Sequence, residues 1–452
     1  MLIRLPWLVS RRALLLVVLL DGLLFVVLYA AAFVRRFGGW PHFSLPLAGL
    51  LGFWLLCSYV VGRYYDAVDL QSAATIKQAI RTLISLLLSV GLFLGWLWLT
   101  ASPSLAATSR GFMLPMLLLY ALSSGLIQQG LNRSLQKSHA ASQLWLVLGS
   151  SKFRQQLDQA LSWSRLSARL QEVDLPHTGW QDLVQAGPVG IVLERVSDLS
   201  EPEIQSLLHL QAKGLIVLTP VGWSELVLQR FPPDLVHTED LLRGQFTAPR
   251  GSIHKRLKRI GDVLVSGLLL LTTAPLMLLS ALLIHLEDGG HVFYVQWRSG
   301  LDGEPFQVWK LRSMRKDAES LGAQWSPRGD PRITRIGYLL RLTRLDELPQ
   351  LWAVFTGTMS LIGPRPERPE IEAELQCQIP HYQLRHLIRP GLSGWAQVNY
   401  PYGASVEDSA NKLSFDLYYL RNSSFWLDLL ILFKTIRLVF NAKGALAFLR
   451  QI

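Results

Sequence analysis

Long apolar runs separated by basic residues dominate the first 135 residues of the chain. The first run extends from Ala13 to Phe33, and three more lie near Phe43–Val61, Leu83–Leu99 and Phe112–Ile127. Each approaches the ~20 residues that cross a bilayer as a helix. The first run has neither the short core nor the small-residue cleavage site of a signal peptide. The pattern therefore predicts a membrane bundle of four spanning helices over residues 1–135.

Basic residues set the expected orientation of this bundle. They gather before the first run, between the second and third, and after the fourth, and Lys and Arg prefer the cytoplasmic side of a membrane. We therefore expect the N-terminus in the cytoplasm, although Arg35 and Arg36 fall on the opposite side. Asp21 interrupts the first run, and an acid at that depth faces other helices for packing or for function.

Between residues 143 and 245 the pattern changes to short apolar runs that alternate with amphipathic stretches. We expect three buried strands and two helices, at Leu144–Leu148, Val189–Leu193, Leu215–Leu218, Lys152–Trp163 and Glu201–Ala212. This alternation predicts a small Rossmann-like α/β domain with a parallel sheet. The first strand ends in Gly149-Ser-Ser151, which lacks the glycine pattern that lets a pyrophosphate approach the backbone. A regulatory or scaffolding role is therefore favoured over dinucleotide binding.

A further apolar run, Gly261–Leu286, is long enough to cross a membrane but contains Pro275 near its middle. Basic residues stand on both sides of it, and both flanks therefore prefer the cytoplasm. They are Lys255, Arg256, Lys258 and Arg259 before the run, and Arg298, Lys310, Arg312, Arg315 and Lys316 after it. A helix that breaks at the proline, enters the membrane and returns satisfies both flanks. The sequence thus predicts a re-entrant hairpin over residues 261–286.

Two adjacent carboxylates, Asp346 and Glu347, lie in the stretch RLTRLDELPQ that ends at Gln350. Proline is well tolerated only in the first turn of a helix, so Pro349 predicts a helix that begins near Asp346 and ends at Gly357. The positive end of the helix dipole favours charged carboxylates, which suit a nucleophile or a cation ligand rather than a general acid. In an alternative interpretation Thr343-x-x-Asp346 is a loose capping box, and the carboxylates only start a helix.

Three other segments carry charges that a catalytic site could use. Gly363-Pro-Arg-Pro366 is a stiff turn that presents the guanidinium of Arg365, a group suited to bidentate phosphate binding. A tight turn at Gly300 and Gly303 precedes an expected strand on which Lys310 and Arg312 alternate, although such a pair is usually a solvated face. Phe425–Phe440 is predicted to be a helix at the membrane surface, with core packing as the alternative.

Composition narrows the partners. Half of the 452 residues are hydrophobic, the net charge is +11 and the pI is about 9.7. This charge suggests anionic partners, namely nucleic acid, phosphorylated substrates or an anionic membrane surface, and the fifteen tryptophans favour the membrane surface. The two cysteines, Cys57 and Cys377, are far apart and are expected to be unpaired, which suits a reducing cytoplasm. His381 and His386 are badly spaced for joint metal binding and receive no role.

LDELPQ (345–350), MSLIGPRPE (359–367) and RPGLSGWAQV (389–398) resemble motifs of the bacterial sugar transferase family, the monotopic polyprenyl-phosphate phosphoglycosyltransferases. The resemblance runs from about Lys255 to Gly444, and the upstream part is similar to the long, membrane-spanning subclass of the family. It implies an α/β catalytic domain over residues 252–452 that includes the re-entrant helix and has amphipathic helices at the membrane interface.

The resemblance implies transfer of a hexose-1-phosphate from a UDP-sugar to polyprenyl (undecaprenyl) phosphate, with release of UMP. This would be the first membrane step of exopolysaccharide, capsule or O-antigen synthesis. Asp346 matches the nucleophile of the family, which forms an aspartyl-phosphosugar intermediate, and Glu347 matches the ligand of Mg²⁺. Arg341 and Arg365 match phosphate ligands, and the further candidates for binding substrate are Lys310, Arg312 and Arg298. Mg²⁺ and arginines would screen the anionic diphosphate so that a carboxylate can attack it.

Three positions depart from the family pattern. Trp297 and His291 replace a glutamate and a proline, and Ala274 replaces the serine that usually precedes Pro275. The first two leave open a non-catalytic membrane scaffold for glycan assembly, and a second alternative is a nucleotide sensor that works through the middle domain. Expected partners are a UDP-sugar, polyprenyl phosphate, membrane lipid and a homo-oligomer. The expected location is the bacterial inner membrane, with the catalytic domain facing the cytoplasm.

Overall fold

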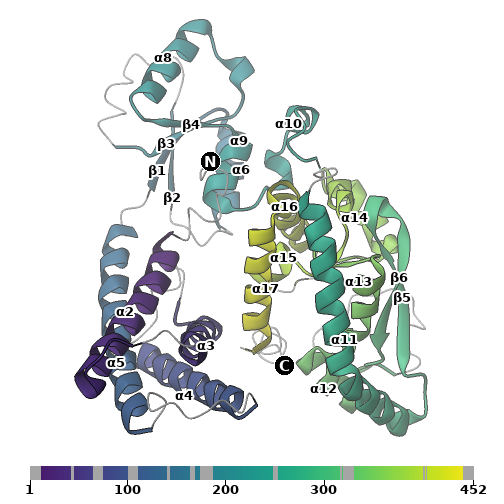
Figure 1. Ribbon diagram of the computed structural model, residues 1–452. Helices are drawn as coiled ribbons and strands as arrows, with labels where there is room; N and C mark the ends of the chain where they lie inside the picture. The colour runs from purple at the N-terminus through teal and green to yellow at the C-terminus, as the bar shows by residue number, and fades with distance from the viewer. Residues whose placement is uncertain are drawn as a thin grey trace. The chain divides into compact units, whose positions relative to one another are not determined.

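A computed structural model describes residues 12–41, 45–64, 75–99, 110–139, 143–162, 168–173, 187–247, 253–315, 318, 330–400, 403 and 405–440. The chain is divided near residue 143 into two compact units (Figure 1). The first unit contains apolar helices. The second contains a parallel sheet and the domain that carries the carboxylate pair.

The first unit consists, in its described part, of α2 (Arg12–Phe37), α3 (Leu45–Val61), α4 (Thr75–Leu99) and α5 (Arg110–His139). Helices α2, α4 and α5 are long and apolar enough to cross a membrane, as predicted. Helix α3 has 17 residues, the lower limit of the roughly 17–25 that span a bilayer. Aromatic side chains such as Phe25, Trp54 and Tyr120 fill the interior, whereas many leucines face outward.

Asp21 is buried between these helices and its carboxylate is fully engaged. It accepts hydrogen bonds from the indole N–H of Trp54 (3.0 Å) and from the hydroxyls of Tyr64 and Ser124. Arg63 lies 3.6 Å from Asp21 and also donates to Ser124 (2.6 Å). These bonds tie α2 to the end of α3 and to α5. They support the packing interpretation of Asp21, because buried charges are tolerated when they are paired and hydrogen-bonded.

The sheet contains β1 (Gln143–Leu148), β2 (Ala168–Glu172), β3 (Gly190–Leu193) and β4 (Ile216–Leu218), in the order β2-β1-β3-β4. Strands β1 and β3 pair in parallel, as do β3 and β4. Helix α6 (Ser151–Ser162) follows β1, and α8 (Glu201–Ala212) lies between β3 and β4. The predicted parallel sheet with helices between its strands is confirmed. Strand β2 was missed because its sequence, ARLQE, contains no apolar run.

Glu194, directly after β3, fills the place where a nucleotide phosphate would approach such a sheet. Its carboxylate accepts a hydrogen bond from the backbone N–H of Ser150 (2.7 Å), in the loop between β1 and α6. A Cβ atom on Gly149 would lie 2.6 Å from the Cβ of Glu194. The turn between the first strand and helix is the usual site for a pyrophosphate. Here a carboxylate of the chain occupies it, which supports the expectation that the domain binds no dinucleotide.

The segment after β4 connects the sheet to the C-terminal domain and packs on that domain. It contains α9 (Pro220–Trp223), η5 (Ser224–Leu228), η6 (Pro233–Leu235) and α10 (Thr238–Leu242). The buried guanidinium of Arg230 donates to the carbonyl of Ala160 at the end of α6 (2.7 Å) and to Asn411 (2.6 Å). The backbone N–H of Phe231 donates to the carbonyl of Ser414 (2.8 Å). Residues 220–245, which the sequence grouped with the middle domain, thus also contact the C-terminal domain.

Helix α11 (Ile253–Asp288) has 36 residues and continues through Pro275 instead of ending there, and its ribbon bends partway along (Figure 1). Near its beginning, Lys258 donates to Asp428 (2.9 Å) and Arg259 donates to the carbonyl of Val354 (2.6 Å). At its other end, Glu287 accepts a hydrogen bond from the backbone N–H of Arg335 (2.9 Å). The part between these contacts exposes mainly leucines, among them Leu264, Leu268, Leu271, Leu278 and Leu282.

The C-terminal domain begins with an antiparallel hairpin of β5 (Phe293–Ser299) and β6 (Pro305–Leu311) around η7 (Leu301–Gly303), where a turn was predicted. Helix α12 (Arg335–Thr343), η8 (Leu345–Gln350) and α13 (Leu351–Thr356) follow. The parallel strands β7 (Ser360–Ile362) and β8 (Gly391–Ser393) enclose α14 (Pro369–Gln378) and η9 (Tyr382–Leu387) in sequence. Helices α15 (Trp395–Asn399), α16 (Val406–Asn422) and α17 (Phe425–Phe440) complete the described part.

Helix α17 turns its charges inward and aromatic residues outward. Asp428 pairs with Lys258, and Lys434 donates to the side chain of Asn399 (2.7 Å). Phe425 and Trp426 are more than half exposed. The inner face therefore packs on the domain, as the alternative interpretation held, and the placement of the outer face at a membrane remains a prediction.

Candidate active site

Asp346 and Glu347 lie together in η8, a 3₁₀ turn that leads directly into α13. Arg344, which ends α12 and precedes η8, has a left-handed backbone (φ 60°). Gly357 (φ 99°) ends α13, so the predicted beginning and end of this helical segment are confirmed. The capping-box alternative is wrong, because Thr343 belongs to α12 and its hydroxyl donates to the carbonyl of Leu339 (2.8 Å).

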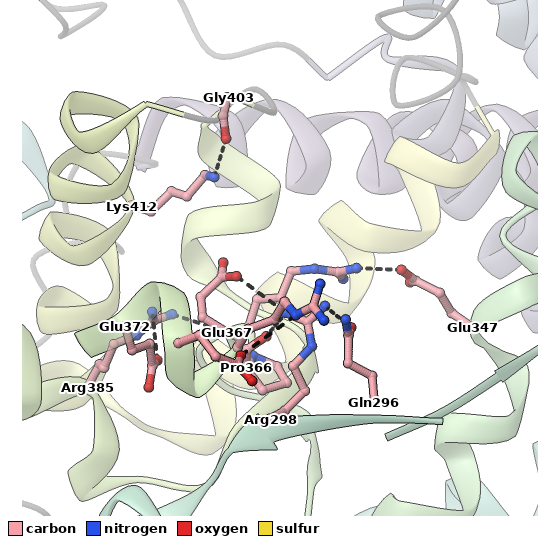
Figure 2. Close-up of polar contacts among 12 residues, drawn as sticks. Gln296, Arg298, Glu347, Pro366, Glu367, Glu372, Arg385, Gly403 and Lys412 are labelled. Carbon is pink, nitrogen blue, oxygen red and sulfur yellow. Dashed lines mark hydrogen bonds and ion pairs between the residues drawn. The ribbon is translucent and has the colours of Figure 1, made fainter. Parts of the chain in front are cut away.

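Glu347 is a charged carboxylate held by two arginines. Arg365 donates to its Oε1 at 2.5 Å, the ion pair dashed at Glu347 in Figure 2, and Arg344 lies 3.4 Å from the same oxygen. Burial acts to raise the pKa of Glu347, but Arg365, Arg344 and Lys310 together hold it below its ordinary value. Glu347 is therefore ionised over the whole range of physiological pH.

Asp346 differs from its neighbour. Its side chain is only 8% exposed, and its Oδ1 has no hydrogen-bond partner among the described residues. Burial, together with the charge of Glu347, raises the pKa of Asp346 to about 6, against the opposing effects of Lys310, Arg344 and Arg341. The expectation that the helix start favours the charged form of both carboxylates is thus wrong for Asp346, because burial outweighs the helix dipole.

Lys310 lies close enough to this pair to interact electrostatically with both carboxylates. Burial, with a contribution from Arg365, lowers the pKa of Lys310 to about 8. Arg341 also acts on Asp346, and its Nε donates to the hydroxyl of Ser313 (2.8 Å). The structure therefore brings together five of the predicted basic and acidic groups, and adds Arg344, which the sequence analysis did not assign to the site.

Arg298 has different surroundings from those expected of a phosphate ligand. Arg298 donates to the carbonyl of Pro366 (3.1 Å) and to the side chain of Gln296 (2.5 Å), and it pairs with Glu367 (3.4 Å; Figure 2). These contacts place Arg298 behind the Pro-Arg-Pro turn. Arg312 follows β6, where its backbone N–H donates to the carbonyl of Val292 (2.9 Å).

Trp297 lies on the opposite face of the hairpin from Gln296 and Arg298. Successive side chains of a strand point to opposite faces, and Trp297 is 53% exposed. The substitution of tryptophan for the family's glutamate therefore leaves the face that holds Arg298 intact. His291 precedes β5 and is also exposed.

Close backbone packing holds the turn that presents Arg365. A Cβ atom on Gly363 would lie 2.3 Å from the carbonyl oxygen of Arg389, and one on Gly394 would lie 2.1 Å from the carbonyl oxygen of Gly363. Only glycine permits such approaches. The motif over residues 389–398 thus supports the turn from behind, while the loop over residues 359–367 carries the arginine.

Among the described residues, no group of three or more His, Cys, Asp or Glu forms a metal-binding cluster. Magnesium at phosphate-handling sites needs only one or two carboxylates, because water and substrate phosphates supply the other ligands. Glu347 is such a carboxylate, and the unbonded Oδ1 of Asp346 lies on the next residue. The residues present therefore fit Mg²⁺.

Residues 253–442 match the family described as "Bacterial sugar transferase". A UDP-N-acetylgalactosamine-undecaprenyl-phosphate N-acetylgalactosaminephosphotransferase of Aeromonas hydrophila is 43% identical over 222 residues, 49% of this chain and 52% of the relative. A UDP-glucose:undecaprenyl-phosphate glucose-1-phosphate transferase of Caulobacter vibrioides is 40% identical over 46% of this chain and 79% of the relative. An exopolysaccharide production protein of Rhizobium leguminosarum is 40% identical over 40% of this chain and 93% of the relative. The chain thus spans about half the length of the first relative and most of the other two. On this similarity, and with the acid pair, the arginine turn and its glycine support in the matched region, the chain belongs to the bacterial sugar transferase family.

Proposed function

We propose that this protein is an enzyme that transfers a hexose-1-phosphate from a UDP-sugar to polyprenyl (undecaprenyl) phosphate and releases UMP. The product would be the first lipid-linked sugar of an exopolysaccharide, capsule or O-antigen. One observation carries the proposal: Asp346, a buried carboxylate with an oxygen that no described residue bonds, lies beside an ionised carboxylate and among cations. Two of the relatives are named for acting on UDP-sugars and undecaprenyl phosphate, and the third for exopolysaccharide production. These names support the proposal.

Asp346 is the nucleophile of this proposal. Its carboxylate oxygen attacks the phosphorus that bears the sugar, and the bond from that phosphorus to the oxygen of UMP breaks. An oxygen of polyprenyl phosphate then attacks the same phosphorus and releases Asp346. Splitting one transfer into two displacements is the usual advantage of a covalent intermediate.

The surrounding cations serve the charges of the reaction. Arg365, Arg344 and Lys310 lie around the carboxylates and would stabilise the charge that spreads over the phosphoryl oxygens. Glu347 would hold Mg²⁺, which supplies further screening of the diphosphate. Arg341 lies in the last turn of α12 and contributes a positive field at Asp346.

The membrane arrangement that we propose keeps this site at the cytoplasmic surface of the inner membrane. Both ends of α11 are bonded to the C-terminal domain, through Lys258 and Arg259 at one end and Glu287 at the other. A crossing helix has its ends on opposite sides of ~30 Å of hydrocarbon. In the arrangement that we propose, helix α11 enters the membrane with its exposed leucines and returns without crossing it. Cysteine probes before Lys255 and after residue 316 should be labelled from the cytoplasmic side only, and labelling of the second probe from outside would contradict this.

Radiolabelled UDP-sugars, incubated with membranes that contain the protein and with polyprenyl phosphate, test the activity itself. A transferase yields labelled lipid, whereas a scaffold or a nucleotide sensor yields none. A panel of UDP-sugars scored for UMP release would identify the sugar. Glu194, which follows β3 and accepts a hydrogen bond from the turn after β1, argues against the sensor, because its carboxylate lies where a phosphate would bind.

A further inference from the structure

The turn that presents Arg365 is held through its carbonyl groups. Proline has no N–H, so the two prolines of this turn cannot donate hydrogen bonds from their backbone. Four successive carbonyls accept instead: Pro364 from the N–H of Gly391 (2.8 Å), Arg365 from the guanidinium of Arg385 (2.7 Å), Pro366 from Arg298 (3.1 Å), and Glu367 from the N–H of Ser299 (3.0 Å). Arg385 is the donor that acts on Arg365 itself.

Arg385 is in turn fixed from several directions. Its side chain is 7% exposed, its Nη2 also donates to Asp416 (3.1 Å), and its Nη1 donates to the hydroxyl of Tyr382 (2.5 Å). Glu372 lies 3.6 Å from Nη1, the contact visible at Arg385 in Figure 2. Asp416 comes from α16, Glu372 from α14 and Arg385 itself from η9. A single guanidinium thus joins three elements to the carbonyl of Arg365.

The other end of Arg365 reaches the catalytic carboxylates, where it donates to Glu347 at 2.5 Å. The backbone of Arg365 is therefore fixed at the buried side and its guanidinium is used at the site. We infer that Arg385 is a positioning residue, which sets the direction of Arg365 and thereby the binding of the donor diphosphate. This inference rests on the proposed function, because it assigns the diphosphate of a UDP-sugar to Arg365.

The geometry requires arginine rather than any cation. The planar fork of a guanidinium serves Arg365, Asp416 and Tyr382 at once, whereas the ammonium of lysine is a point charge without that fork. Arg385→Lys keeps the charge beside Asp416 and Glu372 but loses the fixed geometry. A displacement of about 1 Å in a substrate-binding group is enough to reduce catalysis substantially.

The test compares Arg385→Lys with the wild type in the full-length protein in detergent. We expect the Kd for UDP, measured by calorimetry, and the KM for the UDP-sugar to rise about tenfold, as for a loss of one well-placed contact. The KM for polyprenyl phosphate should stay unchanged. Arg421→Lys is the matched control: Arg421 on α16 bonds Gln245 (2.5 Å) and Glu225 (3.1 Å), away from the turn. It should leave both donor constants unchanged.

A double-mutant cycle separates positioning from general stability. If Arg385 acts through Arg365, Arg385→Lys should weaken UDP binding in the wild type but add little to Arg365→Lys. Equal effects in both backgrounds, or an unchanged Kd in Arg385→Lys, would overturn the inference. Should Arg385→Lys fail to fold, Tyr382→Phe removes one bond to Arg385 and should give a smaller increase in the same constants; no increase would overturn the inference equally.

The same measurements distinguish this inference from the activity on which it rests. A wild type that transfers sugar phosphate, together with an Arg385→Lys variant that binds UDP normally, contradicts only the role of Arg385. A wild type that binds UDP but forms no lipid product contradicts the transfer, while the cycle on UDP binding still decides the role of Arg385. A wild type that does neither contradicts both.

Discussion

Two buried aspartates, one in each unit of the protein, have opposite surroundings. Asp21 accepts hydrogen bonds from Trp54, Tyr64 and Ser124 and lies 3.6 Å from Arg63. Asp346 has an oxygen without a hydrogen-bond partner in the part of the chain that the structure describes, and a pKa raised to about 6. A carboxylate that holds helices together is satisfied on all sides, because an unpaired buried charge is expensive. A carboxylate left unsatisfied among cations is instead available for a reaction.

The largest effect is expected at Asp346. Asp346→Asn should lower turnover on the order of 10⁴-fold, as the loss of a single catalytic residue does in other enzymes. Steady-state formation of lipid-linked sugar is the measurement, with Gln378→Ala as a control on the exposed end of α14. Turnover within tenfold of the wild type would exclude Asp346 as the nucleophile.

The difference in stability between Asp346→Asn and the wild type should depend on pH. The pKa of Asp346 in the folded protein, about 6, exceeds the ~3.9 of a free aspartate. The stability that protonated Asp346 contributes is therefore fully present below pH ~3.9 and is lost as the pH rises through about 6. In metal-free buffer, Asp346→Asn should melt above the wild type at pH 7, and the difference should shrink toward pH 4. A variant that melts below the wild type at pH 7 would contradict this.

At Asp21 the same substitution should have the reverse effect. Asp21→Asn leaves Arg63 buried without its carboxylate and should reduce the free energy of unfolding by about 3–5 kcal/mol. Unfolding in detergent micelles, followed by tryptophan fluorescence, measures it. A double variant, Asp21→Asn with Arg63→Met, removes the stranded charge and should recover part of the loss. The assignment of Asp21 to packing fails if Asp21→Asn is as stable as the wild type but inactive.

Glu347 is an intermediate case, because its carboxylate pairs with Arg365 and Arg344 and is also proposed to hold Mg²⁺. Glu347→Gln should raise the Mg²⁺ concentration needed for half-maximal activity by roughly 10–100-fold, and chelation should stop the wild-type reaction. The measurement is the rate against free Mg²⁺ at saturating substrates. Full activity of the wild type in excess chelator would rule out the magnesium role.

The local sequence predicted the turn that carries the two acids but not their chemical states. Pro349 and Gly357 determine where the helical segment begins and ends, and both are visible in the sequence. The raised pKa of Asp346 depends on burial, to which β6, distant in sequence, contributes by packing against η8. No local pattern predicts that Arg385 meets the carbonyl of Arg365, because twenty residues separate them.

The hairpin of β5 and β6 is another place where the sequence alone did not predict the surroundings of a side chain. A departure from the family at Trp297 raised a doubt about the pocket, and the sequence alone did not show that Trp297 lies on the exposed face of the strand, opposite Arg298. The bend of α11 is a second case: Pro275 indicated a break, whereas the helix continues through it and both its ends bond the same domain.

The smallest effect is expected at Trp297, on the exposed face of the hairpin of β5 and β6. Trp297→Glu, which restores the residue usual in the family, should change kcat/KM by no more than about twofold, as exposed substitutions do. Gln296→Ala is the matched comparison on the same strand, because it removes the side chain that Arg298 bonds (2.5 Å), and it should reduce kcat/KM more. A large change in Trp297→Glu, equal to that of Gln296→Ala, would place both faces of the hairpin at the site.

Trapping the covalent intermediate tests the central claim most directly. The protein is incubated with a UDP-sugar labelled in the phosphate next to the sugar, without polyprenyl phosphate, then quenched and digested. The account predicts a labelled peptide that contains residues 345–350, modified at Asp346, that disappears on addition of polyprenyl phosphate and is absent from Asp346→Asn. Labelled lipid formed without any labelled peptide, or a label on another residue, would contradict it.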